Sequence, residues 1–333
     1  MLHLLMTTTS RFQPLRRLLL AGLVTTAAGL AHAQGTTPTL RILVGFPPGG
    51  GTDAIARVLA DKMKDVLNQP VIVENRAGAG GQIAAHALKA AAPDGTTVFL
   101  SHDHSISILP LVTKNAGFDP AVDFVPVAGF ATFANGMAVS GGTPAKSVAE
   151  YVEWVKASKG GKDTIGVPAP GSIPEFMVGL IAKKYGLDLQ AAPYRGSAPM
   201  MADMLGNQIS SGMGSVPDFI ENQKAGKIRM VAVIGDKRQA ILPDVPTFAE
   251  LGVKGLEDLP YYGLFAPAGT PPAQLERIGQ ALQRVIAMPD VNERLTGMGL
   301  TVGYQAQAPF AKRVTAYTQT WTKIIRDSGF QPK

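Results

Sequence analysis

The stretch LRILVGFPPGGGTD, residues 40–53, decides how this chain folds. Its first part, Leu40 to Gly45, is a short apolar run typical of a β-strand, and the apolar spacing after Asp53 is typical of an amphipathic helix. A strand that enters a helix through glycines leaves the first helical N–H groups unpaired and lets a ligand approach the backbone. We therefore predict an anion-binding loop formed by Phe46, Pro47, Gly49, Gly50, Gly51 and Thr52.

The composition of this loop indicates which kind of anion it takes. It has neither the Gly-Lys-Ser/Thr sequence of a P-loop nor the Gly-x-Gly-x-x-Gly spacing of a dinucleotide fold, so it is not built for a nucleoside polyphosphate. A hydrogen bond to a carboxylate contributes about 1.5 to 3 kcal/mol, and a helix terminus adds about 0.3 to 1 kcal/mol. Several such contacts hold a small carboxylate at about micromolar affinity. No lysine is required.

The first 33 residues have the features of a secretory signal peptide. Arg16 and Arg17 precede an apolar run, and Ala31-His32-Ala33 forms a small-x-small cleavage site. A membrane anchor is the alternative, but the apolar run is short and is interrupted by threonines. We expect cleavage after Ala33 and an exported protein. The general secretory route and the twin-arginine route both remain open.

The charge and cysteine content narrow the choice of partners. The chain of 333 residues carries a formal net charge of +6, and removal of residues 1–33 leaves 28 basic and 25 acidic residues, a net charge of +3. This mild excess does not suggest a nucleic-acid partner. The chain contains no cysteine, so neither a disulfide framework nor thiolate chemistry is available. With 46% hydrophobic and 17% charged residues, it has the composition of a folded globular protein.

Apolar runs that alternate with helical patterns predict parallel sheets covered by helices, in two α/β domains. The expected strands are 40–45, 71–74, 97–101, 125–133, 137–140, 164–167, 189–194, 209–213 and 230–234. The expected helices are 52–67, 81–91, 148–157, 174–185, 198–205 and 217–225, followed by a long helical region that Pro271-Pro272 opens. Extended segments near 129–136 and 258–271 predict two crossings between the domains. Domain 1 would then comprise 34–134 and 260–333, and domain 2 would comprise 135–259.

Polar loops after the predicted strands should line a cleft between the two domains, because ligands bind beyond the carboxyl ends of strands in open α/β sheets. Besides the first loop, these segments supply hydroxyl groups, imidazoles and unpaired N–H groups. The further candidate ligand-binding residues are Ser101, His102, His104, Gly171, Ser172, Tyr194, Arg195, Gly196, Ser197 and Ser215.

Some charged residues allow two interpretations. Arg195 either meets a ligand carboxylate or holds its own loop through carbonyl groups or Asp218. For Asp53, helix capping is favoured over ligand contact. His102 and His104 form a His-x-His pair, but a catalytic zinc normally takes three protein ligands and no further motif supports one. We therefore predict neither a metal nor a cofactor, and expect one of these histidines to donate to a ligand oxygen.

An enzyme is the alternative functional class. A secreted hydrolase or isomerase acting on a small carboxylate would fit the same cleft. However, no Gly-x-Ser-x-Gly nucleophile motif occurs, and the loop serines have no histidine and acid partner nearby in sequence. We therefore predict a binding protein without catalytic residues.

Several motifs together resemble the Bug family, the periplasmic receptors of tripartite tricarboxylate transporters. The resemblance extends over almost all of the chain after residue 33. Besides residues 45–53, it rests on Val73-Glu74-Asn75-Arg76-Ala77-Gly78-Ala79-Gly80-Gly81, Pro93-Asp94-Gly95-Thr96, Phe118-Asp119-Pro120, Asp123-Phe124-Val125-Pro126-Val127, Pro193-Tyr194-Arg195-Gly196-Ser197-Ala198-Pro199, Leu242-Pro243-Asp244-Val245-Pro246-Thr247 and Ala266-Pro267-Ala268-Gly269-Thr270-Pro271.

The resemblance implies a two-domain periplasmic-binding-protein fold, or Venus flytrap, in which each domain is a mainly parallel sheet flanked by helices. It implies a monomeric receptor that captures a small organic carboxylate and delivers it to membrane permease subunits, or acts as an orphan receptor. By that likeness, Phe46 to Thr52 hold one carboxylate, while Gly171, Ser172 and Tyr194 to Ser197 form the variable end. The chain departs from its relatives at 102–104, at 173–177 and at Tyr261-Tyr262, where a tryptophan is frequent.

Overall fold

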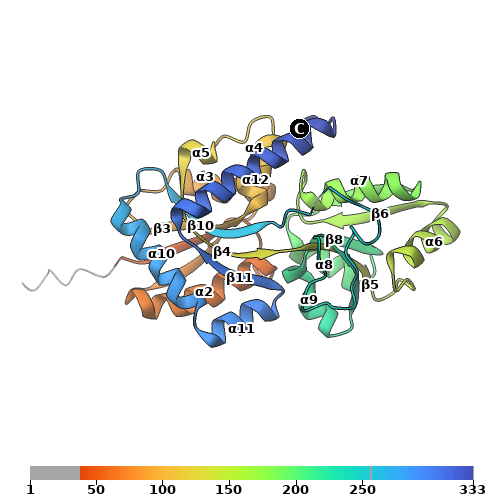
Figure 1. Ribbon diagram of the computed structural model, residues 1–333, viewed down its shortest axis with the longest axis horizontal. Coiled ribbons are helices and arrows are strands. Elements are labelled where there is room, and N and C mark those ends of the chain that lie inside the picture. The colour runs from red at the N-terminus through yellow and green to blue at the C-terminus, as the bar shows by residue number, and fades with distance from the viewer. Residues whose placement is uncertain (1–37, 256, 333) are drawn as a thin grey trace, which may run out of the picture. The chain divides into compact units, whose positions relative to one another are not determined.

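The computed structural model describes residues 38–255 and 257–332 of the chain (Figure 1). The predicted signal peptide, residues 1–33, lies outside this part. Residues 39–333 form one compact unit. Among the helices described, none combines the length and the apolar character that crossing a membrane requires.

Two sheets organise this unit, and we call each sheet with the helices packed on it a lobe. The first sheet has the order β11-β4-β10-β3-β1-β2 and the second has the order β7-β6-β8-β5-β9. The strands of the first sheet are β1 (Leu40–Val44), β2 (Val71–Asn75), β3 (Thr97–His102), β4 (Phe124–Phe133), β10 (Tyr261–Pro267) and β11 (Leu300–Gln305). Those of the second are β5 (Asn135–Ser140), β6 (Lys162–Val167), β7 (Asp188–Pro193), β8 (Ser211–Ser215) and β9 (Ile228–Val233).

The sheets are mixed, which corrects the prediction that each is mainly parallel. Strands β1, β2 and β3 are parallel, but β10 is antiparallel to β3 and β4, and β11 is antiparallel to β4. In the second sheet β5 is antiparallel to both β8 and β9. The reason is the chain path: β5 and β10 begin where the chain crosses between the sheets, whereas β3, β4 and β8 end at that edge.

Helices cover both sheets, as Figure 1 shows. Those predicted from the apolar pattern lie within two residues of their expected bounds. The helices of the first lobe are α2 (Gly51–Leu67), α3 (Gln82–Lys89), α4 (Leu109–Val112), α5 (Pro120–Asp123), α10 (Pro272–Ile286), α11 (Pro289–Gly297) and α12 (Gln307–Asp327), with the short 3-10 helix η1 (Ala79–Gly81) and the short π-helix η2 (His104–Ile108); α4 and α5 were not predicted. In the second lobe they are α6 (Val148–Lys159), α7 (Ile173–Tyr185), α8 (Ser197–Leu205) and α9 (Val216–Lys224).

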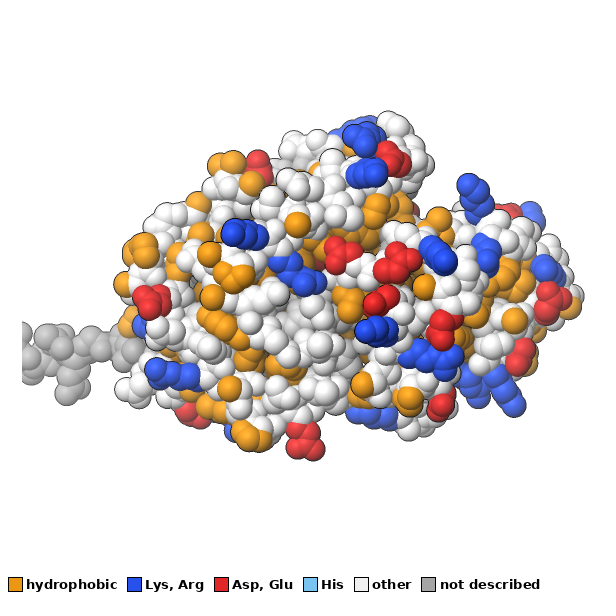
Figure 2. All heavy atoms as spheres, viewed as in Figure 1, with side chains coloured by type: hydrophobic (Ala, Val, Ile, Leu, Met, Phe, Trp, Pro, Cys, Tyr) orange, Lys and Arg blue, Asp and Glu red, His pale blue; other side chains and the backbone are white. Residues whose placement is uncertain are grey.

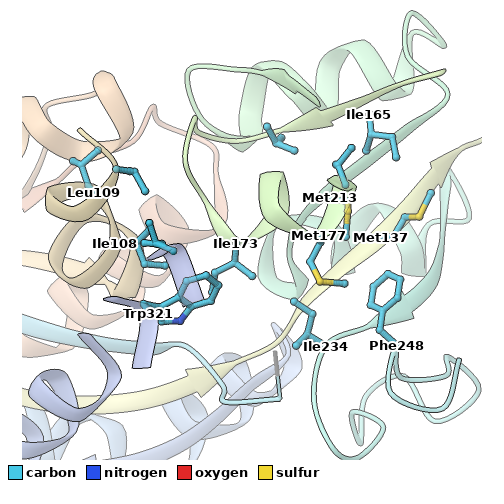
Figure 3. Packing of buried hydrophobic residues seen from close by; sticks show 14 of the residues in the cluster. Ile108, Leu109, Met137, Ile165, Ile173, Met177, Met213, Ile234, Phe248 and Trp321 are labelled. Atoms are coloured by element: carbon cyan, nitrogen blue, oxygen red, sulfur yellow. The ribbon is translucent and has the colours of Figure 1, made fainter. Parts of the chain in front are cut away.

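One apolar cluster joins elements of both lobes (Figure 3). Ile108 and Leu109 come from the first lobe, as does Trp321 on α12, and Ile173 and Met177 come from α7 of the second lobe. The Phe176 ring on α7 lies 5.8 Å from the Trp321 ring, measured between centroids. Burial of this surface stabilises the contact between α7 and α12 in proportion to the apolar area removed from water.

The charged side chains are distributed without a single-sign stripe on the face that Figure 2 presents. Lysine and arginine side chains alternate there with aspartate and glutamate side chains. This mixed distribution agrees with the small net charge of residues 34–333, which is +3. A clustered basic surface is the feature typical of a nucleic-acid-binding protein.

Candidate functional site

A pocket lies where loops of the two lobes meet, and eight predicted ligand-binding residues line it. In the first lobe they come from the loop between β1 and α2, the start of α2, the end of β3 and the start of η2; in the second they come from the loop before α7, the start of α8 and the end of β8. These residues are Phe46, Gly50, Thr52, His102, His104, Ser172, Ser197 and Ser215. The pocket therefore lies at the carboxyl ends of strands, where ligands of open α/β sheets bind.

The other predicted residues do not line this pocket. Pro47, Tyr194 and Arg195 line a separate, more open hollow, together with residues 77–80. Gly49, Gly51, Ser101, Gly171 and Gly196 line neither. Arg195 is exposed, and the pocket is lined by neither Arg195 nor any other arginine or lysine. Asp218, the suggested partner of Arg195, instead accepts hydrogen bonds from Gly51, Ser197 and Ser215.

Sequence reasoning missed several lining residues. Asp103, Ile173, Pro174 and Tyr262 stand in the sequence only as departures from the family pattern, and Asp218 only as a possible partner of Arg195. The pocket also contains Asp103, Phe133, Asn135, Pro168, Ala169, Ile173, Pro174, Asp218 and Tyr262. A signal existed for Phe133 and Asn135, because both lie in the predicted first crossing, and crossing segments form the floor of a cleft between two lobes.

The first N–H group of α2 already has a partner, and this partner is a carboxylate of the second lobe. The Gly51 N–H, which is the first of the helix, donates to Asp218 Oδ1 of the second lobe over 2.9 Å. Ser197 Oγ donates to the same oxygen and Ser215 Oγ donates to Asp218 Oδ2, each over 2.6 Å. Three groups predicted to hold a ligand carboxylate thus hold a carboxylate of the protein itself. Asp218 links the lobes at this point.

Each of three helices at the pocket carries an acidic residue at its third position. Asp53 of α2 accepts from the Gly49 N–H, and Glu175 of α7 accepts from the Gly171 N–H. Asp218 holds the corresponding place in α9. Burial disfavours the charged form of Asp53, but hydrogen bonds from Arg57, Gly49 and Asn75 outweigh this and lower its pKa. The favoured interpretation of Asp53 as a structural group agrees with these contacts.

Two of the loop glycines allow the lobes to approach each other closely. A Cβ atom at Gly51 would lie 2.9 Å from Asp218 Oδ1 and 3.1 Å from the Pro217 backbone. At Gly171, where φ is +64°, a Cβ atom would lie 2.5 Å from Val112 of the first lobe. These glycines therefore serve contact between lobes, whereas the sequence suggested that the first loop serves contact with a ligand.

His104 is a buried imidazole at the wall of the pocket. Its exposed fraction is 4%, and neither ring nitrogen has a hydrogen-bond partner within the described residues. Burial, with a smaller contribution from His102, lowers the pKa of His104 to about 3. The ring is therefore neutral near pH 7 and offers one donor and one acceptor. An unpaired buried polar group is costly, so a ligand that pairs with it gains affinity.

Aromatic side chains form one wall of the pocket around His102. The His102 ring stacks on Phe46 with 5.1 Å between centroids and meets the edge of Tyr262 at 5.4 Å. Phe133 packs on Tyr262 at 4.7 Å. Tyr262 is buried, and its hydroxyl shares a hydrogen bond of 3.1 Å with Thr52 Oγ1. This wall can bind an apolar or a cationic group of a ligand.

His102 and His104 do not belong to a metal-binding group. Nowhere in 38–255 or 257–332 do three or more histidine, cysteine, aspartate or glutamate residues gather in a way that could hold a metal ion. His102 Nδ1 instead lies 3.3 Å from Asp103 Oδ1.

Comparison with known proteins identifies the relatives of this chain. Residues 55–330 match the model of the "Tripartite tricarboxylate transporter family receptor". A Cupriavidus necator protein described as "UPF0065 protein in gbd 5'region" is 33% identical over 290 residues, covering 87% of each chain. Protein BugT of Bordetella pertussis is 29% identical over 327 residues, covering 96% of this chain and 99% of its own.

Solved structures agree with these matches. One described as "Structure of a periplasmic transporter" is 31% identical and covers 90% of this chain and 100% of its own, with a TM-score of 0.84. A Rhodopseudomonas palustris protein solved with adipate has 28% identity, the same coverage and a TM-score of 0.83. MatC from the same organism, solved with malate, has 27% identity, covers 86% of this chain and 98% of its own, and has a TM-score of 0.78. The chain has the two-domain periplasmic-binding-protein fold and belongs to the receptor family of tripartite tricarboxylate transporters.

Proposed function

We propose that this receptor captures a small organic carboxylate in the pocket between its lobes and delivers it to the membrane permease of a tripartite transporter. The observation that carries the proposal is the pocket itself, which combines the buried, unpaired imidazole of His104 with polar residues of both lobes. Relatives solved with adipate and malate support a carboxylate as the ligand. The family supports a receptor over the alternative, a secreted enzyme.

The lobes would act as the two predicted domains, 34–134 with 260–333 and 135–259. Ligand contacts that exist only when the lobes are together would shift the population toward the closed form. Export with cleavage after Ala33, a monomeric state and the absence of a nucleic-acid partner belong to the same proposal. Mass spectrometry of the periplasmic protein tests the cleavage site, and light scattering tests the monomer.

A thermal-shift titration tests the ligand class. Four- to six-carbon acids are compared with phosphate and glucose. A ligand at one hundred times its dissociation constant stabilises the protein by about 2.7 kcal/mol. We expect at least one acid to raise the melting temperature, and the His104→Ala variant to lose at least tenfold in affinity for it. His86→Ala, at an exposed site on α3, serves as the control. A response to phosphate or glucose alone would contradict the proposal.

A further inference from the structure

The charge of the pocket wall does not match a ligand that is negative at both ends. The lining includes the carboxylates of Asp103 and Asp218, and no lysine or arginine. Asp218 already receives the Gly51 N–H, so a ligand carboxylate placed at the start of α2 would meet a like charge there. Like charges a few Å apart, in a site partly shielded from water, repel each other by several kcal/mol.

Asp103 is a buried carboxylate with weak partners. Its exposed fraction is 2%. Its oxygens lie 3.3 Å from His102 Nδ1 and 3.3 Å from the Tyr317 hydroxyl, both at the long end for hydrogen bonds. Burial raises the pKa of Asp258, and Arg313 lies close enough to oppose this rise. Arg313 is not part of the pocket wall. A buried carboxylate is stabilised when a cation or strong donor comes within contact distance.

Two further features point to a ligand with both a donor end and an acceptor end. The rings of Phe46, Phe133 and Tyr262 surround His102 beside these carboxylates, and aromatic faces attract cations. His104, which is buried and without a partner at either ring nitrogen, lines the same pocket and can donate to a carboxylate. The acidic residues thus share the pocket wall with an independent, unpaired imidazole.

We propose that the preferred ligand is a small amino-carboxylate, with a protonated nitrogen facing Asp103 and Asp218 and a carboxylate facing His104. The inference rests on the proposed function, since it names the chemistry of the same site. It assigns Asp218 the role of a specificity-determining residue. A dicarboxylate of equal length is disfavoured because its second carboxylate has no cation to meet.

Matched ligand pairs test this directly on the full-length mature protein by isothermal titration calorimetry. The pairs are 4-aminobutanoate and succinate, 5-aminopentanoate and glutarate, and 6-aminohexanoate and adipate. Within the pair that binds best, we expect the amino acid to bind at least tenfold more tightly than the diacid. Equal or tighter binding of the diacid would overturn the inference and leave the proposed function standing. No binding by any of the six would overturn the inference, and the thermal-shift titration would decide the proposed function separately.

Variants then locate the preference in the protein. Asp218→Asn should reduce the preference for the amino acid over the diacid at least fivefold, and Asp103→Asn should act in the same direction. Asp61→Asn, at an exposed site on α2, should leave the preference unchanged. If Asp218→Asn binds the amino acid and retains the full preference, Asp218 does not determine specificity. The ligand pairs on the unmodified protein decide the inference even if Asp103→Asn fails to fold.

Discussion

The starts of α2 and α7 are built alike but meet the opposite lobe by different means. Both helices follow a glycine loop, and both carry an acidic residue that accepts from an N–H four residues earlier, Asp53 from Gly49 and Glu175 from Gly171. At α2 the next contact is polar, from the Gly51 N–H to Asp218 of the second lobe. At α7 it is apolar, through the cluster that contains Ile173 and Trp321.

This contrast shows that a helix start is not an anion site for a ligand merely because its N–H groups lack helical partners. At α2 an internal carboxylate, that of Asp218, already accepts from the first of these N–H groups. Hydrogen bonds to a charged group contribute about 1.5 to 3 kcal/mol, and apolar burial contributes about 25 cal/mol per Å². The lobes are therefore held by a polar contact that responds to charge at one place and by an apolar contact at another.

The largest expected effect comes from breaking the apolar contact. Trp321 is buried and packs against Phe176 and Tyr317. Trp321→Ala should lower the free energy of unfolding by about 3 to 5 kcal/mol, as is usual for removal of a large buried ring. Urea denaturation followed by circular dichroism measures it. Trp154→Ala, at a half-buried site on α6, should cost clearly less. Equal losses in the two variants would mean that the contact between α7 and α12 stabilises the fold no more than the half-buried Trp154 does.

His104, which lines the pocket, should make stability depend on pH. Its pKa in the folded protein is about 3, against about 6.5 when unfolded, so the unfolded chain binds the proton more readily. The stabilisation is present above pH 6.5 and is lost as pH falls, by about 1.7 kcal/mol between pH 6.5 and 5. Denaturation curves at both pH values measure the loss. His104→Gln should reduce it and His86→Gln should not; an unchanged slope in His104→Gln would contradict the assignment.

Breaking the polar contact at α2 should have a smaller effect. In Gly51→Ala the new Cβ atom would lie 2.9 Å from Asp218 Oδ1, so the hydrogen bond between them must lengthen. We expect a loss of about 1.5 kcal/mol in the free energy of unfolding. The matched control is Gly179→Ala inside α7, where nothing lies within 4 Å and alanine should stabilise the helix by about 0.5 to 1 kcal/mol. A stabilised Gly51→Ala variant would argue against the contact.

The smallest expected effects test whether Asp53 and Glu175 have the same role at the starts of α2 and α7. Asp53→Asn and Glu175→Gln should each cost about 1 kcal/mol, because each weakens a hydrogen bond at a helix N-terminus. The pKa of Asp53 is lowered, so its contribution should be present near pH 7 and disappear as pH falls below about 4. Chemical denaturation of both variants at pH 7 and pH 3 measures these losses of stability. If Asp53→Asn lowers the free energy of unfolding by the same amount at both pH values, the charge of Asp53 is not the cause of the loss.

The sequence was sufficient to predict the two-lobe α/β fold, because the alternation of apolar runs and helical patterns is regular from Leu40 to Val233. Two features could not be predicted from the sequence, namely strand β11 and the segment η2 that follows β3. Strand β11 is short and half-exposed between two helices, so its pattern is weak. The π-helix η2 begins directly after β3, at His104, where the sequence suggested an open polar loop.

The position of the candidate pocket follows from the sequence in outline, but the charge of its wall does not. Loop positions such as Thr52, His102 and Ser172 follow from the rule that ligands bind beyond strand ends. The contact between Asp218 and Gly51 could not be predicted, because these residues are 167 positions apart and lie on different lobes. Arg195, the only basic residue in the predicted set besides the histidines, points to a different hollow.

A crystal structure of the mature protein with its best-binding acid tests the central claim most directly, because it shows which carboxylate occupies the start of α2. The account predicts that Asp218 still accepts from the Gly51 N–H and that the ligand carboxylate lies within hydrogen-bond distance of His104. A ligand carboxylate bound to the Gly51 N–H, with Asp218 displaced, would contradict it.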